Sequence, residues 1–109
     1  MKEANWKERI WFFLGRRKGF LVEGNSMLPA LKDGDAVLID GSEKVVEGDI
    51  VLAKHPFKES VKILKRVKNF DDKGDLFLVG DNGEESTDSR TFGAVPLKYL
   101  IGKATCRLK

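Results

Sequence analysis

The sequence predicts a mainly β protein: one small domain preceded by a short amphipathic helix. From residue 20 onward, short aliphatic runs alternate with glycine- and aspartate-rich turns, the pattern of strands joined by tight connections. Helical spacing of apolar residues over more than one turn is expected only before residue 15. A chain of 109 residues with 41% hydrophobic content is sufficient for one core. We therefore expect a helical and basic segment over residues 1–19 and a single β-domain over residues 20–109.

The N-terminal segment predicts a helix over residues 5–14. Its apolar positions recur at helical spacing and are Trp6, Ile10, Phe13 and Leu14. This helix either packs on the domain or lies in a lipid interface with the basic run 16–18 on the headgroups, a peripheral membrane contact. The apolar run 10–14 is far shorter than the roughly 20 residues of a membrane span, so we expect no transmembrane anchor.

Six strands are predicted after this helix, each bounded by turn residues. They cover residues 20–22, 36–39, 49–53, 61–67, 76–79 and 100–106. One helical turn is expected at 27–32, directly behind Ser26.

Charge and reactive side chains exclude several classes of function. The net charge is only +3 and the basic residues are interleaved with acids, so we expect no nucleic-acid partner. Cys106 is the only cysteine, which excludes an intrachain disulfide, and His55 is the only histidine, which argues against a histidine-rich metal site. We expect no metal and no cofactor, and a cytoplasmic location or a peripheral one at a membrane.

A serine hydrolase needs a nucleophile, a base, a group that holds the base, and donors for the oxyanion. Ser26 lies in the segment 24–29, which reads GNSMLP. Gly24 permits a sharp turn that presents both the Ser26 hydroxyl and a free N–H. An ordinary structural turn is the alternative.

Lys65 is the candidate base, because alternate residues of a strand face opposite sides of the sheet. Lys65 shares its face with three aliphatic residues, whereas Lys62 lies on the face of Arg66, which we expect to contact solvent. The three are Val61, Ile63 and Val67. Burial among them would lower the pKa of Lys65 and provide the neutral amine that a base requires. A lysine that extends to water from an edge strand is the alternative.

The segment 80–90 is a polar loop after an apolar strand. Ser86 is placed to hydrogen-bond an amine and hold its direction, while Asp88 and Arg90 can pair as carboxylate and guanidinium. A solvated turn of the same composition is the alternative.

Five sequence blocks together resemble signal peptidase I. They are residues 22–29, 34–38, 48–51, 65–67 and 80–93. The resemblance implies a signal-peptidase-like β-fold with a Ser/Lys dyad, in which Ser26 attacks a peptide carbonyl and Lys65 accepts its proton. It implies no metal or cofactor.

The same resemblance implies supporting roles around the dyad. Ser86 would orient Lys65, and Asp88 with Arg90 would brace the loop. The Ser26 N–H would serve the oxyanion hole. Some members add a serine hydroxyl two positions earlier, where this sequence has Gly24, so the second oxyanion donor is left open.

The sequence departs from the family in two ways: we expect neither an anchor nor a second β-domain, and Ala30 stands where threonine is common. The first departure bears on the substrate. A short chain without an anchor resembles one subgroup of the family, the maturation proteases of nickel-type superoxide dismutase. The segment 54–56 also resembles that subgroup. This implies a precursor protein with an N-terminal leader as substrate, and a structural His55. The alternatives are a membrane-associated signal peptidase that cleaves secretory signal peptides, and a non-catalytic repressor-like binding domain. Against the latter, no helix-turn-helix region and no Ala-Gly dipeptide occur.

Overall fold

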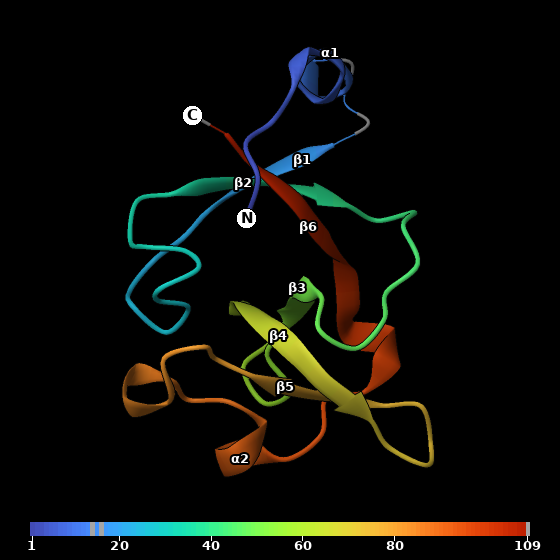
Figure 1. The fold of residues 1–109 in the computed structure, drawn as a ribbon. Helices are drawn as coiled ribbons and strands as arrows, with labels where there is room; N and C mark the ends of the chain where they lie inside the picture. Colours follow the sequence, from blue (N-terminus) through green and yellow to red (C-terminus); the bar gives the residue numbers. More distant parts are fainter. Residues whose placement is uncertain (14, 16, 109) are drawn as a thin grey trace.

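Six antiparallel strands form one sheet in the computed structural model, which describes residues 1–13, 15 and 17–108 apart from the side chains of residues 11–13 (Figure 1). The elements are α1 (Trp6–Phe13), β1 (Lys18–Leu21), β2 (Ala36–Asp40), β3 (Ile50–Lys54), β4 (Lys62–Phe70), β5 (Leu76–Val79), α2 (Ser89–Phe92) and β6 (Leu100–Leu108), with 3-10 turns at Gly83–Glu85 and Leu97–Tyr99. The strand order is β1-β2-β6-β3-β4-β5. The predicted mainly β architecture with a short N-terminal helix is confirmed.

The six predicted strands all occur, and their ends differ for reasons of pairing. β4 continues to Phe70 because β5 supplies partners up to the pair Phe70↔Leu76. The helical turn expected at 27–32 is a single turn, closed by the Leu31 N–H donating to the Met27 carbonyl at 3.0 Å. Pro29 has no N–H with which to continue a helical ladder.

Helix α1 begins where the Asn5 side chain accepts a hydrogen bond from the Glu8 N–H at 2.9 Å. Trp6 is 67% exposed and Ile10 47% exposed, so the described part of the predicted apolar face contacts solvent. The other two members of that face, residues 13 and 14, have side chains outside the described part. Within the described residues, no helix has the length and apolar character to cross a bilayer.

Both faces of the sheet are covered. One cluster of buried residues includes Val22, Met27, Leu31, Val37, Leu52 and Leu64. The second consists of Val51, Ala53, Val67, Leu76, Leu78 and Val95. The prediction that the Lys62 face of β4 contacts solvent is therefore wrong for Leu64, which is 7% exposed. The segment after β1 packs over that face through Val22 and Met27, which periodicity within one strand cannot reveal.

The two ends of the described chain meet beside β6. The Ala4 N–H donates to the Arg107 carbonyl at 2.7 Å, and Ala4 is buried with Leu38 and Cys106. Burial raises the pKa of the Cys106 thiol, which keeps it protonated and a poor nucleophile.

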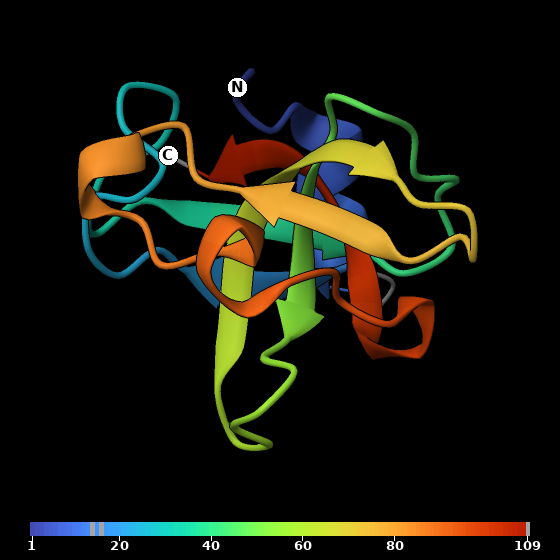
Figure 2. The same cartoon turned by 90° about the horizontal axis from the view of Figure 1, so that it is seen from below.

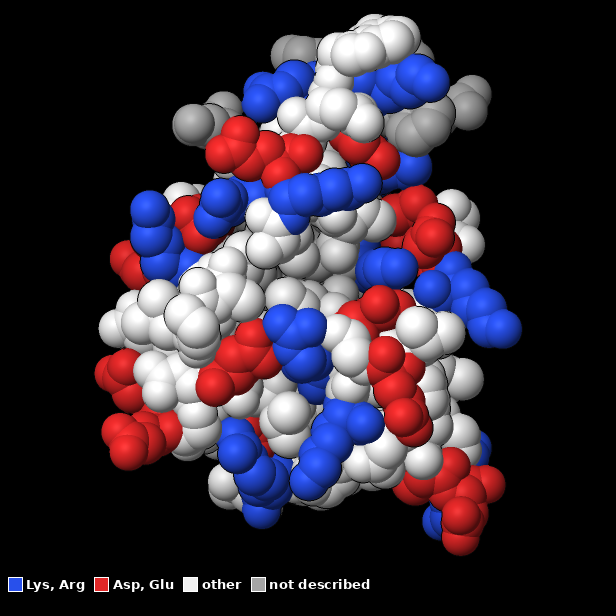
Figure 3. Space-filling view, viewed as in Figure 1, with Lys and Arg blue, Asp and Glu red and all other residues white. Residues whose placement is uncertain are grey.

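Surface charge is mixed on the face shown in Figure 3, where lysine and arginine side chains lie among aspartate and glutamate side chains. That face offers no continuous basic band for a phosphate backbone. From below, the connection between β3 and β4 projects away from the rest of the domain (Figure 2).

Candidate active site

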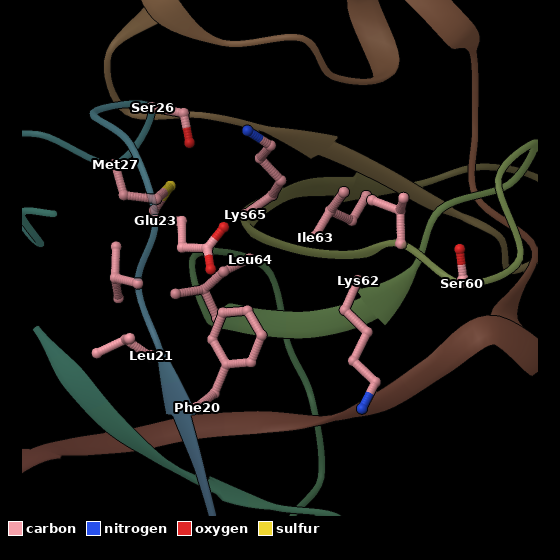
Figure 4. Close-up of a pocket in the computed structure, with 12 residues that line it drawn as sticks. Phe20, Leu21, Glu23, Ser26, Met27, Ser60, Lys62, Ile63, Leu64 and Lys65 are labelled. Carbon is pink, nitrogen blue, oxygen red and sulfur yellow. The ribbon is translucent and has the colours of Figure 1, made fainter. Parts of the chain in front are cut away.

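A groove of about 670 Å³ lies between the end of β1 and the first half of β4, and it contains both Ser26 and Lys65 (Figure 4). Residues 20–23 form one wall, residues 60–65 form the other, and Ser26 and Met27 close one end. Two segments about forty positions apart in the sequence thus share one groove.

Ser26 is half-buried in a turn that follows β1. Gly24 has a φ of +78°, a left-handed conformation that favours glycine, and its N–H donates to Asp33 Oδ1 at 2.7 Å. The turn continues with the Leu28 N–H donating to the Asn25 carbonyl at 3.2 Å. Neither the N–H nor the hydroxyl of Ser26 forms a hydrogen bond with any other residue that the structure describes. Both groups are therefore without an internal partner, and the hydroxyl points into the groove (Figure 4).

Lys65 is buried, with 6% of its surface exposed, and its Nζ donates to Ser86 Oγ at 3.1 Å. Burial lowers the pKa of Lys65, because a desolvated ammonium is disfavoured. The carboxylate of Asp88 opposes this shift and the guanidinium of Arg90 adds to it. The result is a pKa below the ordinary lysine value and a larger fraction of neutral amine at any given pH.

Ser86 links Lys65 to a buried carboxylate. The Ser86 hydroxyl donates to Asp88 Oδ2 at 2.7 Å, so its oxygen is left to accept the hydrogen bond from Lys65. Asp88 also accepts from the Gly80 N–H at 2.9 Å and from Arg90 Nε at 3.0 Å. Burial alone would raise the pKa of Asp88, but these hydrogen bonds, led by that of Arg90, hold it well below its usual range. A permanent carboxylate therefore fixes the direction of the Ser86 hydroxyl.

The Lys65 amine extends toward Ser26, and the Ser26 hydroxyl points into the same end of the groove (Figure 4). In the described part of the chain, no hydrogen bond joins these two groups directly. Catalytic hydrogen bonds are often long before substrate binds, so this geometry does not exclude proton transfer between them. The structure thus places Ser26, Lys65, Ser86, Asp88 and Arg90 in one region, with Gly24 shaping the turn.

Two further residues hold the site together, and the sequence assigned no role to either. A Cβ at Gly80 would lie 2.2 Å from Ser86 Oγ and 2.6 Å from the Ser26 carbonyl oxygen. The Asn82 N–H donates to the same Ser26 carbonyl at 2.8 Å, and its Nδ2 donates to the Asn25 carbonyl at 3.1 Å. Both residues belong to the block 80–93 that resembles signal peptidase I, and this resemblance was the only feature of the sequence that pointed to them. Their contacts with the Ser26 turn could not be predicted locally, because Asn82 and Asn25 are 57 positions apart.

His55 lies outside the residues that line the groove. Its Nδ1 accepts from the Phe57 N–H at 3.0 Å, and its ring centre is 4.9 Å from that of Phe92. Burial lowers the pKa of His55, and nearby Lys58 adds to the shift. Among the described residues, no group of three or more His, Cys, Asp or Glu side chains could hold a metal ion.

Comparison with known proteins adds a family to this geometry. The model of the family described as Peptidase S24-like matches residues 15–95. The mitochondrial inner membrane protease subunit 1 of Xenopus tropicalis is 32% identical over 111 residues, covering 81% of this chain and 66% of the relative. Its Homo sapiens counterpart is 30% identical, covering 76% and 64%. Signal peptidase I of Buchnera aphidicola is 56% identical over 32 residues, covering 29% and 10%. The chain thus spans about two thirds of the length of these two protease subunits.

Proposed function

The chain belongs to the Peptidase S24-like family, and from this premise we propose that it is a serine endopeptidase that removes an N-terminal leader from a precursor protein. The observation that carries the proposal is the buried Lys65 amine, held by Ser86 and directed at Ser26 across the end of the groove. A buried lysine with a lowered pKa beside a serine is the arrangement that a Ser/Lys dyad requires.

In the proposed first step, neutral Lys65 accepts the hydroxyl proton of Ser26 as Oγ attacks the scissile carbonyl carbon. The carbonyl oxygen becomes an oxyanion, and the Ser26 N–H is available to donate to it. Gly24 offers no side-chain donor, and its N–H is already bonded to Asp33, so the second oxyanion donor must come from elsewhere.

In the second step, the carbon–nitrogen bond breaks and the Lys65 ammonium gives its proton to the leaving amine. The leader is left as an ester on Ser26. Water then attacks this ester while Lys65 accepts a proton from the water, and the returning proton restores the Ser26 hydroxyl. Lys65 ends each turnover neutral, so one titratable group serves both halves of the reaction.

The free edge of β1 supports an extended substrate in the groove. The Val22 N–H donates to the Asp35 carbonyl at 2.7 Å, in register with the pairing of β1 and β2. Because backbone groups of an antiparallel strand alternate in direction, those of Leu21 point away from β2. β1 is the terminal strand of the sheet, so these groups have no strand beside them.

A second free edge lies on β4 across the groove. The His55 N–H donates to the Val61 carbonyl at 2.8 Å, so the backbone groups of Lys62 and Leu64 point away from β3. Pairing with β5 begins only at Arg66. A peptide strand in the groove can therefore pair with both walls, a recognised mode of binding by strand addition.

For the substrate, we propose the precursor of a nickel-type superoxide dismutase, with small residues just before the cut, as the likeness to short signal-peptidase-type proteins suggests. The test is incubation of the purified protein with that precursor in detergent-free buffer, followed by mass spectrometry of the new N-terminus. Ser26→Ala should reduce the rate on the order of 10⁴- to 10⁶-fold while thermal unfolding stays within a few degrees of the wild type. Equal turnover by wild type and Ser26→Ala would exclude the serine mechanism.

A second candidate is processing of leaders at a membrane surface. Its support is that several relatives are named inner membrane protease subunits and that α1 exposes Trp6 and Ile10. Sedimentation with anionic lipid vesicles tests it. Binding lost in Trp6→Ser, together with cleavage that requires vesicles, would favour this candidate over processing in the cytoplasm.

A further inference from the structure

Glu23 is an acidic residue in the wall of the groove, three positions before Ser26. Its carboxylate points into the groove (Figure 4). Of the residues that the structure describes, none forms a hydrogen bond or ion pair with this carboxylate. An acid that lines a groove without an internal partner is available to a bound ligand.

Neighbouring acids differ from Glu23 in this respect. Asp33 accepts the Gly24 N–H at 2.7 Å, and Asp35 accepts the Lys32 N–H at 2.9 Å and lies 3.8 Å from Arg107. Both carboxylates shape the turn that carries Ser26. Glu23 has no such structural contact, so its charge is not needed to hold this turn.

The cations of the groove also leave Glu23 unpaired. The charged groups that shift the pKa of Lys65 are Asp88 and Arg90, and Glu23 is not among them. Lys62 extends from the opposite wall, and its Nζ points away from Glu23 (Figure 4). A positively charged side chain of a bound peptide could therefore pair with the Glu23 carboxylate, which no cation of the groove neutralises.

We propose that Glu23 is a specificity-determining residue that binds a lysine or arginine side chain of the substrate close to the cleaved bond. The inference rests on the proposed function, because it assigns the substrate preference of that same groove. Three residues of extended chain span at most about 11 Å, so the backbones of Glu23 and Ser26 lie within that distance. We therefore expect the bound side chain within about three positions of the bond that Ser26 attacks.

A substrate strand that covers the groove removes water around Glu23 and strengthens the pair beyond an open surface contact. We expect a lysine at the matching position to raise kcat/KM about 5- to 30-fold over glutamine, the range of a charge-assisted hydrogen bond that stays partly hydrated. A glutamate at that position should be cleaved more slowly than glutamine, because like charges repel.

The experiment uses a peptide set in which lysine, glutamine or glutamate replaces each of the three positions on either side of the cleaved bond. Cleavage is measured with the wild type, Glu23→Gln and Glu23→Lys, and binding with Ser26→Ala by calorimetry. Glu47→Gln is the matched control, because Glu47 is an exposed acid outside the groove lining. We expect one position with a lysine preference, its loss in Glu23→Gln, its reversal toward glutamate in Glu23→Lys, and no change in Glu47→Gln.

Cleavage without a charge preference, or a preference that survives in Glu23→Gln, would overturn the assignment of Glu23. The wild type could fail to cleave any peptide while Ser26→Ala still binds the lysine peptides preferentially. That result would refute the peptidase proposal and still support Glu23 as the cation site. Absence of both cleavage and binding across the set would overturn both.

Discussion

Substitution of Gly80 by alanine tests whether close packing around the site sets its activity. The added Cβ would lie 2.2 Å from Ser86 Oγ, 2.5 Å from Ser86 Cβ and 2.6 Å from the Ser26 carbonyl oxygen. Two of these neighbours are the Oγ and Cβ of Ser86, whose hydroxyl accepts the hydrogen bond from Lys65. The third is the backbone of Ser26, the proposed nucleophile. None is the far end of a flexible side chain, so the surrounding loops must move.

The size of the movement follows from contact distances. Non-bonded heavy atoms of this kind sit at roughly 3.5 Å, so Ser86 must move by about 1 Å to accommodate the methyl group. A displacement of 1 Å in a catalytic constellation costs on the order of 100-fold in rate. Over-packing typically lowers the free energy of unfolding by about 1–3 kcal/mol, so most of the protein should remain folded.

The assay is kcat/KM for leader cleavage, measured together with thermal unfolding. We expect a fall of about 100-fold for Gly80→Ala with a folded domain. Gly41→Ala is the matched control, since its Cβ would meet only the Ile101 carbonyl oxygen at 3.3 Å, outside the groove lining. A folded Gly80→Ala protein with wild-type kcat/KM would refute the reasoning that Gly80 holds Ser86 and Ser26 in place.

Four further predictions concern the proposed role of Lys65 as the base. Lys65→Met should reduce kcat/KM about 10²- to 10⁴-fold while Lys62→Met costs little, and the reverse order would show that the base is misassigned. In the wild type, kcat/KM should rise with pH along one ionisation whose midpoint lies below the ordinary lysine value of 10.5, because deprotonation of Lys65 creates the base. Between that midpoint and 10.5, Lys65 is protonated in more of the unfolded chains than of the native ones. The free energy of unfolding should therefore also rise with pH in this range, and Lys65→Met should remove the rise. His55→Ala should retain most activity, whereas its loss in a folded protein would point to a Ser/His pair instead.

The strands were predictable because each satisfies a local rule. Alternation of aliphatic residues placed β4 and put Lys65 on the same face as Ile63 and Val67. Lys65 and Val67 are buried and Ile63 is partly buried, as predicted. The prediction is wrong for Val61, which precedes β4 and is 39% exposed. The same alternation misassigned the opposite face, because the cover over Leu64 comes from the segment after β1. Local periodicity shows which residues share a side, but not what packs against that side.

The residues that brace the candidate site were less accessible to sequence reasoning. Gly80 and Asn82 act through contacts with the Ser26 turn, and nothing in their own neighbourhood indicates such a contact. In the sequence, Glu23 cannot be distinguished from other exposed acidic residues. Its place in the groove is seen only once residues 60–65 are known to form the opposite wall. Contacts between distant segments decide the role of all three, and these exist only in the folded chain.

The pairing of Asp88 with Arg90 reduces a conflict that the proposed role of Lys65 as a buried base creates. The Asp88 carboxylate accepts the Ser86 hydroxyl and fixes its direction, but a carboxylate near Lys65 also stabilises the ammonium form and raises the pKa of Lys65. Arg90 binds Asp88 through Nε and Nη2, and its positive charge acts on Lys65 in the opposite direction. The carboxylate can therefore orient Ser86 while Arg90 opposes its effect on the amine, and burial remains the largest influence on the pKa of Lys65.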